Sequence, residues 1–166
     1  MPYALPWSIT NCQSSDLAEL PLEICNMPYA LSWYITNCHL LQNLPYDIGN
    51  MSHLRILRLS ALPGLKELPV SIGKLEELEY LDISVCEGLK QLPKEIGQLK
   101  KLREFDMREC SCLRRLPTTV CELSCLKLVV CDEKIGKQWM RTKNISIPEL
   151  TVEIVEAHFS LDWLDD

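Results

Sequence analysis

Cysteine is the residue type with the most chemical potential in this 166-residue chain, which has nine cysteines and three scattered histidines. The motifs Cys110-x-Cys112 and Cys121-x-x-x-Cys125 bring four thiols into one short stretch, and clustered thiolates are typical zinc ligands. However, these spacings match neither a zinc ribbon nor a zinc finger, and no histidine stands near them. The sequence therefore predicts no metal site.

Paired carboxylates are the second candidate for chemistry, because two acids held close together can divide the general acid and base roles. Asp82 and Asp106 stand 24 residues apart. We expect both on an exposed column that faces solvent or a partner, not in a catalytic dyad. The chain also has no nucleophile elbow, zinc-protease motif or phosphate-binding loop. We therefore expect a protein that is not an enzyme and that binds no cofactor.

Composition narrows the choice of partners and compartment. The formal net charge is −6, and the one compact basic cluster, around Arg114-Arg115, is interpreted as a solvated face. A nucleic-acid partner is not expected, since a duplex binder presents a basic face to the phosphates. No apolar run of about 18 residues is present to cross a bilayer, and the first residues lack the features of a signal peptide. We expect a cytoplasmic protein with no direct membrane insertion.

The pattern Leu-Pro-x-x-Ile/Val recurs five times at an unvarying 24-residue spacing, starting at Leu20, Leu44, Leu68, Leu92 and Leu116. The clearest unit is Leu78-x-x-Leu81-x-Ile83-x-x-Cys86-x-x-Leu89, which has the leucine-rich-repeat signature. Such repeats bury their apolar faces only against their neighbours and stack into a solenoid. The sequence therefore predicts an α/β leucine-rich-repeat horseshoe with a parallel concave sheet, short helical or 3-10 convex turns and an irregular C-terminal cap.

Each repeat divides into a strand and a turn. Alternating apolar and polar residues in L-x-x-L-x-L predict a short strand with its leucines inward. The Leu-Pro step belongs on the convex side, where proline has no N–H to donate, and Pro-x-x-Ile-Gly-x-Leu predicts one helical or 3-10 turn. We expect Gly49, Gly73 and Gly97 to loosen that turn.

The repeat register explains most of the cysteines. One repeat position is shared by Cys12, Cys38, Cys86 and Cys110. There we expect a small buried side chain whose sulfur contacts the turning backbone weakly. Cys25 and Cys121 replace the convex glycine, and Cys131 continues the inward column. Only Cys112 and Cys125 have no packing role.

The chain divides into three segments: a partial, duplicated N-terminal repeat at 1–19, the 24-residue repeats at 20–131 with the last one partial, and a cap with an acidic tail at 132–166. Residues 1–12 nearly repeat at 27–38, and the longer link that follows predicts a bulge near residues 14–17. Because the chain begins within a repeat and has no polar capping segment, we expect a further segment upstream.

The C-terminal segment carries its own pattern. Residues 132–143 predict a short helix containing Trp139, and residues 150–155 alternate as a strand does. We expect Trp139, Ile145 and Ile147 to cover the last repeat. The closing FSLDWLDD is an acidic, amphipathic tail.

Several stretches carry a family resemblance. Residues 68–93, LPVSIGKLEELEYLDISVCEGLKQLP, resemble the leucine-rich repeats of plant intracellular nucleotide-binding immune receptors. Residues 92–110, the motif Val130-Cys131-Asp132 and the final FSLDWLDD are similar to the C-terminal end of the helper class with an RPW8-type coiled coil, the activated-disease-resistance group. The resemblance covers residues 20–166.

The resemblance implies a recognition and autoinhibitory region in defence signalling. It implies a protein partner, with lipase-like immune-regulator heterodimers as the example, and an upstream nucleotide-binding domain if the chain is a fragment. It also implies nuclear or membrane association through a full-length receptor. The chain itself has neither the coiled-coil domain nor the phosphate-binding loop, so neither pore formation nor nucleotide switching is assigned to it.

We expect the concave face to bind the partner. Its predicted contact residues are Tyr34, Arg58, Tyr80, Asp82, Glu104, Asp106 and Arg108. Tyrosine and arginine are the expected anchors, because a few Tyr, Trp and Arg residues supply most of the binding energy in protein interfaces. The alternative is a stand-alone intracellular repeat scaffold or a decoy unrelated to nucleotide switching; an enzyme is disfavoured because no nucleophile constellation is found.

Overall fold

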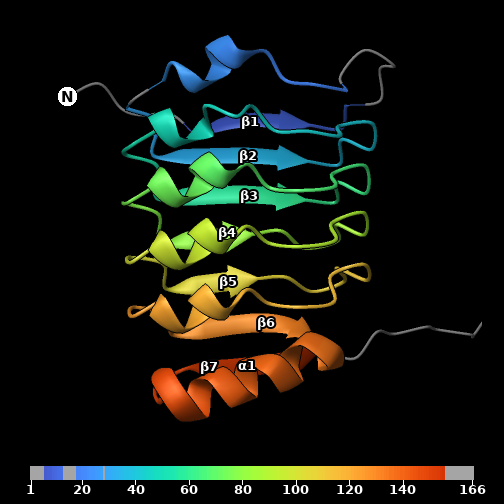
Figure 1. Ribbon diagram of the computed structural model, residues 1–166. Helices are drawn as coiled ribbons and strands as arrows, with labels where there is room; N and C mark the ends of the chain where they lie inside the picture. The colour runs from blue at the N-terminus through green and yellow to red at the C-terminus, as the bar shows by residue number, and fades with distance from the viewer. Residues whose placement is uncertain (1–5, 13–17, 28, 156–166) are drawn as a thin grey trace, which may run out of the picture.

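A computed structural model describes residues 6–12, 18–27 and 29–155 of the chain. Its strands form one parallel seven-stranded sheet in the order β1 to β7, stacked side by side in sequence order (Figure 1). The strands are β1 Trp7–Thr10, β2 Ser32–Thr36, β3 Ile56–Ser60, β4 Tyr80–Asp82, β5 Glu104–Asp106, β6 Leu128–Asp132 and β7 Thr151–Val155. Trp33 pairs with Leu57 and Leu57 with Leu81, so the 24-residue period of the sequence sets the register of the sheet.

The predicted turns are 3-10 helices that run along one side of the sheet (Figure 1). They are η1 Leu22–Cys25, η2 Ile48–Asn50, η3 Val70–Lys74, η4 Lys94–Gln98 and η5 Thr118–Glu122. Proline precedes four of the five with a φ between −64° and −67°, which matches the fixed dihedral of its ring. The prediction of helical or 3-10 turns after Leu-Pro is confirmed.

The expectation that glycine loosens these turns is wrong. A Cβ placed at Gly49, Gly73 or Gly97 would lie 2.5, 2.7 or 2.3 Å from a backbone carbonyl oxygen of the following repeat. No described glycine has a positive φ, so conformational freedom is not what the position requires. Glycine stands there because adjacent 3-10 turns approach each other too closely for a side chain.

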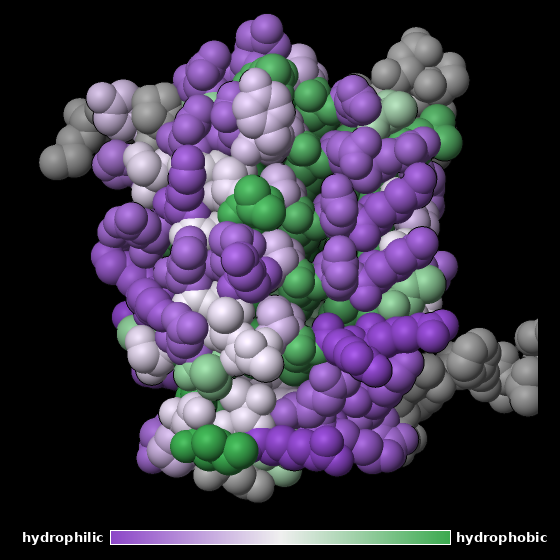
Figure 2. Space-filling view, viewed as in Figure 1, coloured by the Kyte–Doolittle hydropathy of each residue, from purple (hydrophilic) through white to green (hydrophobic). Residues whose placement is uncertain are grey.

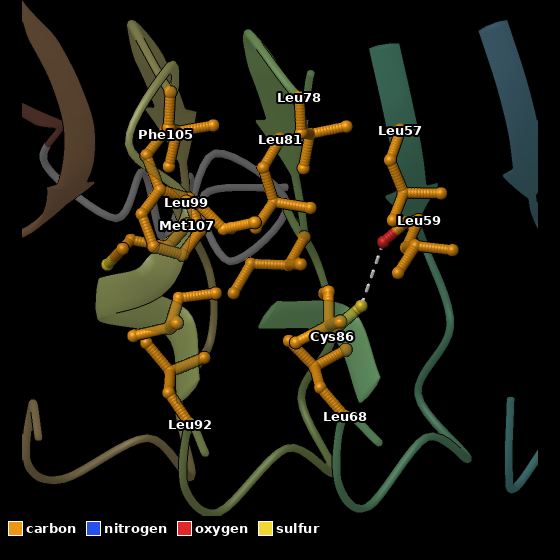
Figure 3. Packing of buried hydrophobic residues seen from close by; sticks show 14 of the residues in the cluster. Leu57, Leu59, Leu68, Leu78, Leu81, Cys86, Leu92, Leu99, Phe105 and Met107 are labelled. Atoms are coloured by element: carbon orange, nitrogen blue, oxygen red, sulfur yellow. Dashed lines mark hydrogen bonds between the residues drawn. The ribbon is translucent and has the colours of Figure 1, made fainter. Parts of the chain in front are cut away.

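The core consists of the inward residues of every strand and turn. Leu57, Leu81 and Phe105, from three successive strands, point to the same side of the sheet (Figure 3). The prediction for the cysteine position is confirmed at Cys86 and Cys110: the Cys86 thiol donates to the Leu59 carbonyl at 3.0 Å, as Figure 3 shows, and the Cys110 thiol donates to the carbonyl of Ile83 at 3.1 Å, whereas Cys12 is only half-buried. Burial raises the pKa of the Cys86 thiol to about 12, so this group is a neutral packing residue and not a nucleophile.

One backbone feature recurs just after the strands. Five residues there have a left-handed φ of 54° to 57°: Asn11, Asn37, Ala61, Val85 and Glu109. Asparagine tolerates this conformation, and Asn37 Nδ2 also donates to Asn11 Oδ1 at 3.1 Å. Valine does not tolerate it well, since its branched Cβ crowds the backbone.

The C-terminal cap is α1, Glu133–Ser146, followed by β7. Trp139 is fully buried and meets the Phe105 ring edge-on at 6.4 Å, and Ile147 is buried as expected. The expectation for Ile145 is wrong, because this side chain is 84% exposed in the last turn of α1. The helix also ends at Ser146, three residues beyond its predicted end. Residues 1–5 of the first copy of the duplicated segment, the predicted bulge near residues 14–17 and the acidic tail lie outside the described residues.

Candidate functional site

Three side chains meet on the sheet face that is turned away from the core, called the concave face below. Tyr34 on β2, Arg58 on β3 and Tyr80 on β4 alternate with buried neighbours, so the strand period places them on this face. The Arg58 guanidinium lies 5.8 Å from the Tyr34 ring centroid and 5.6 Å from that of Tyr80. Arg58 Nη2 also donates to the Tyr80 hydroxyl at 3.4 Å. These three residues form the aromatic–arginine patch.

A buried carboxylate holds the patch together. Asp82 is only 5% exposed, and its Oδ2 lies 2.9 Å from Arg58 Nε. Its other oxygen, Oδ1, accepts the backbone N–H of Ser84 at 2.9 Å. The hydrogen bond to Tyr80 raises the pKa of Arg58, and burial raises the pKa of Tyr80. At neutral pH the patch therefore presents a charged guanidinium beside a neutral phenol.

A second buried aspartate lies one strand further along, and it pairs with an arginine of its own repeat. Asp106 is 4% exposed; its Oδ2 accepts from Arg108 Nε at 3.0 Å, and its Oδ1 accepts the Arg108 backbone N–H at 3.2 Å. The expectation that Asp82 and Asp106 stand on an exposed column is wrong. Both point to the concave side, but arginine side chains cover them. Each carboxylate fixes an arginine side chain and accepts a backbone N–H of the following turn, and so it is not available to a partner.

The remaining predicted contact residue, Glu104, is exposed on β5 and pairs in register with Tyr80. Of the seven predicted contact residues, the structure brings Tyr34, Arg58 and Tyr80 together around Asp82. It brings Arg108 together with Asp106, two strands from Arg58.

Sequence reasoning missed part of this face. A shallow hollow of about 520 Å³ beside Tyr80 is lined by residues at the start of the strands: Leu31, Ser32, Arg55, Ile56, Glu79, Tyr80, Arg103 and Glu104. Arg55 Nε donates to Glu79 Oε1 at 2.8 Å, and this hydrogen bond lowers the pKa of Glu79. The signal was available in the sequence, since Arg55, Glu79 and Arg103 repeat every 24 residues with alternating charge.

The side chains of the patch are of types suited to binding. In the described residues, no group of three or more His, Cys, Asp or Glu side chains is placed to hold a metal ion. Cys112, Cys121 and Cys125 are exposed and separate from the patch. What the face offers is two aromatic rings and fixed guanidinium groups, which are enriched in protein interfaces.

Seven in-register parallel strands, a turn after each Leu-Pro and continuous buried leucine columns define a leucine-rich-repeat solenoid. No protein-family model matches the chain. Over 41 residues the chain is 42% identical to the disease resistance protein ADR1 of Arabidopsis thaliana. The match covers 25% of this chain and 5% of that protein, so the chain spans only a small part of the relative's length.

Three solved structures are also similar. The leucine-rich-repeat domain of the type III effector XopL is 20% identical with a TM-score of 0.37, covering 82% of this chain and 57% of that chain. The plant peptide hormone receptor RGFR1, solved in complex with RGF2, is 18% identical with a TM-score of 0.30, covering 83% and 34%. The receptor kinase ectodomain of GASSHO1/SCHENGEN3 from Arabidopsis thaliana is 15% identical with a TM-score of 0.31, covering 84% and 26%.

Among the described residues, no helix has both the length and the apolar character needed to cross a membrane.

Proposed function

We propose that this chain is a protein-binding leucine-rich-repeat module that recognises a protein partner through its concave face. The observation that carries the proposal is the aromatic–arginine patch, in which Asp82 holds Arg58 between two tyrosine rings before any partner arrives. A preordered anchor loses less conformational entropy on binding than a free arginine does. The repeats at 20–131 supply the binding face, and residues 132–166 supply the cap and tail.

We further propose that the module is the recognition and autoinhibitory region of a plant disease-resistance receptor of the helper class. The short match to ADR1 supports this, together with the resemblance of residues 68–93 and of the closing FSLDWLDD. All nine cysteines are free thiols, which fits action in the reducing cytoplasm. The alternative is a stand-alone repeat scaffold or decoy. Sequencing full-length transcripts separates the two: an in-frame phosphate-binding loop upstream supports the receptor, and a frame that starts at Met1 supports the decoy.

Binding through the concave face is tested with purified lipase-like immune-regulator heterodimer as the probe. Arg58→Ala is combined with Asp82→Asn and Tyr80→Ala, so that no uncompensated carboxylate is left buried. We expect the triple variant to lose at least about tenfold in affinity by calorimetry, because hot-spot truncations commonly cost about 2 kcal/mol or more.

The matched control removes a cation, an acid and an apolar group from other exposed positions by Lys74→Ala, Glu76→Gln and Met140→Ala. It should bind as the unmodified chain does. An equal loss of affinity in the control and the triple variant would reject the concave face as the binding site. The concave face would also be rejected if the triple variant bound the probe as tightly as the unmodified chain does. Absence of binding by the unmodified chain would reject this partner class.

A further inference from the structure

Two cysteines stand side by side at the start of the stack. The segments WSITNC and WYITNC end at Cys12 and Cys38 and are nearly identical. They form β1 and β2, which run parallel with Thr10 paired to Thr36. Each cysteine follows two residues after its threonine, so the two cysteines leave the sheet as neighbours.

The backbone takes the same path after both strands. Asn11 and Asn37 both have a φ of 56°, and Asn37 Nδ2 donates to Asn11 Oδ1 at 3.1 Å. Neighbouring strands lie about 4.8 Å apart, and a disulfide requires a Cα–Cα distance of about 4.4–6.8 Å. The spacing of these two repeats therefore suits a disulfide between Cys12 and Cys38.

The Cys38 thiol lies on the side of the preceding repeat. Its Sγ donates to the Thr36 carbonyl oxygen at 3.6 Å. The same oxygen accepts the Asn11 backbone N–H at 3.1 Å, so it points toward the repeat that carries Cys12. Burial, followed by the contact with the Cys12 side chain, raises the pKa of the Cys38 thiol to about 11. The two sulfurs are therefore neighbours, and Cys38 is the less reactive of the pair toward an oxidant in solution.

The other stacked pair, Cys86 and Cys110, is arranged differently. Both of its thiols donate to backbone carbonyls of the preceding repeat, at 3.0 and 3.1 Å, and both are buried. Cys12 is half-buried. The strands end at one edge of the solenoid, on the right in Figure 1, and hydrophilic side chains cover much of that edge in Figure 2. A charged, water-soluble oxidant therefore has access to Cys12 that it does not have to Cys86.

A bond at this place would act on the end of the sheet. Within the described sheet, β1 pairs only with β2, whereas each strand from β2 to β6 has a neighbour on both sides. A terminal repeat is held by one interface, and the ends of a structure open at a lower free energy than its centre. A covalent link between the first two described repeats therefore strengthens the place where the stack opens most easily.

We propose that Cys12 and Cys38 are a redox-sensitive pair that forms a disulfide during oxidation and cross-links the first described repeat to the second. With a small-molecule disulfide such as oxidised glutathione, the Cys12 thiolate attacks one sulfur and expels one glutathione thiolate. The Cys38 sulfur gives its proton to water, attacks the Cys12 sulfur and expels the second glutathione thiolate. The two cysteines lose two electrons, and one glutathione disulfide becomes two glutathione thiols. The bond lies outside the aromatic–arginine patch, so it stands or falls independently of the proposed function.

The test incubates the full-length chain in buffers of reduced and oxidised glutathione, blocks the remaining thiols with N-ethylmaleimide and identifies disulfides by peptide mass spectrometry. We expect the Cys12–Cys38 cross-link to be the main disulfide. Cys12→Ser should remove it, and the matched control Cys112→Ser, which removes an exposed thiol, should leave its yield unchanged.

Three results would overturn the proposal. The first is a glutathione adduct on Cys12 with no cross-link. The second is a Cys86–Cys110 cross-link of equal yield, since it would show that neither access nor orientation selects the pair. The third is a Cys12–Cys38 yield that rises with protein concentration, since it would place the bond between two copies of the chain.

Hydrogen exchange measures what the bond does to the end of the sheet. Oxidation should slow the exchange of the Asn11 amide, which donates to the Thr36 carbonyl, by at least about tenfold, because the cross-link restricts the opened state. The amides of β5 should exchange at an unchanged rate, and Cys12→Ser should abolish the effect at Asn11. Equal exchange of the Asn11 amide in the reduced and the cross-linked chain would reject the strengthening of the terminal repeat.

Discussion

Replacing Val85 with asparagine should stabilise the protein. Val85 is held at a φ of 57°, where its Cβ crowds the backbone and costs roughly 1–2 kcal/mol; glycine has no Cβ, and asparagine tolerates this conformation. Two other repeats carry asparagine at this position, Asn11 and Asn37, and their side chains are hydrogen-bonded. Val85 is half-buried, so part of the gain is offset by lost apolar burial. We expect a net gain of about 1 kcal/mol in the free energy of unfolding.

Urea unfolding followed by circular dichroism measures this change. The midpoint should rise at an unchanged m-value, and the melting temperature should rise by about 2–4 °C for a chain of this size. Val70→Asn is the matched control, because Val70 is exposed in η3 and has no positive φ; we expect a change within about 0.5 kcal/mol. A Val85→Asn variant that is no more stable than the unmodified chain would refute the claim that this position is strained.

Phe105→Ala should lower the free energy of unfolding by about 3–5 kcal/mol, because it opens a cavity beside Trp139. Glu104→Ala on the same strand should change it by no more than about 0.5 kcal/mol. Urea unfolding compares the two variants, and equal losses would contradict the alternation of inward and outward side chains along this strand. Gly97→Ala should lower the free energy of unfolding by about 1–3 kcal/mol, because the added methyl group crowds the backbone of the next turn. An unchanged melting temperature would contradict the close approach of the two turns. With a disulfide reagent at pH 8, the exposed Cys112 should react at once, and Cys86 only on unfolding, because burial removes access and raises its pKa to about 12; rapid reaction of Cys86 in the folded chain would contradict its burial.

The period alone was enough to predict the strand positions, the inward columns and the 3-10 turns. Each repeat buries the same set of apolar positions against its neighbours, so one unit such as residues 78–89 predicts the strand and the buried positions of the others. The role of Gly97 was not predictable in this way. Its constraint comes from the backbone of the following turn, and sequence spacing does not give the distance between two turns.

The concave face shows where alternation stops being informative. Alternation says correctly that Asp82 points away from the core, but exposure depends on what the neighbouring strands put beside it. Arg58 is 24 residues earlier and lies one strand away, and its long side chain covers the carboxylate. Comparing equivalent positions of adjacent repeats, 24 residues apart, would have paired Arg55 with Glu79 and indicated the hollow beside Tyr80.

Burial of Asp82 also changes what Arg58 can contribute to recognition. A buried carboxylate is tolerated only when it is paired, so Arg58 serves the fold as well as the surface. Its side chain is 44% exposed, however, and two of its guanidinium nitrogens are used by Asp82 and Tyr80. Under the proposed function, a partner would therefore meet one remaining edge of a fixed guanidinium framed by two rings. Such an edge selects by geometry more than by charge, because the pair with Asp82 leaves little net charge at the patch.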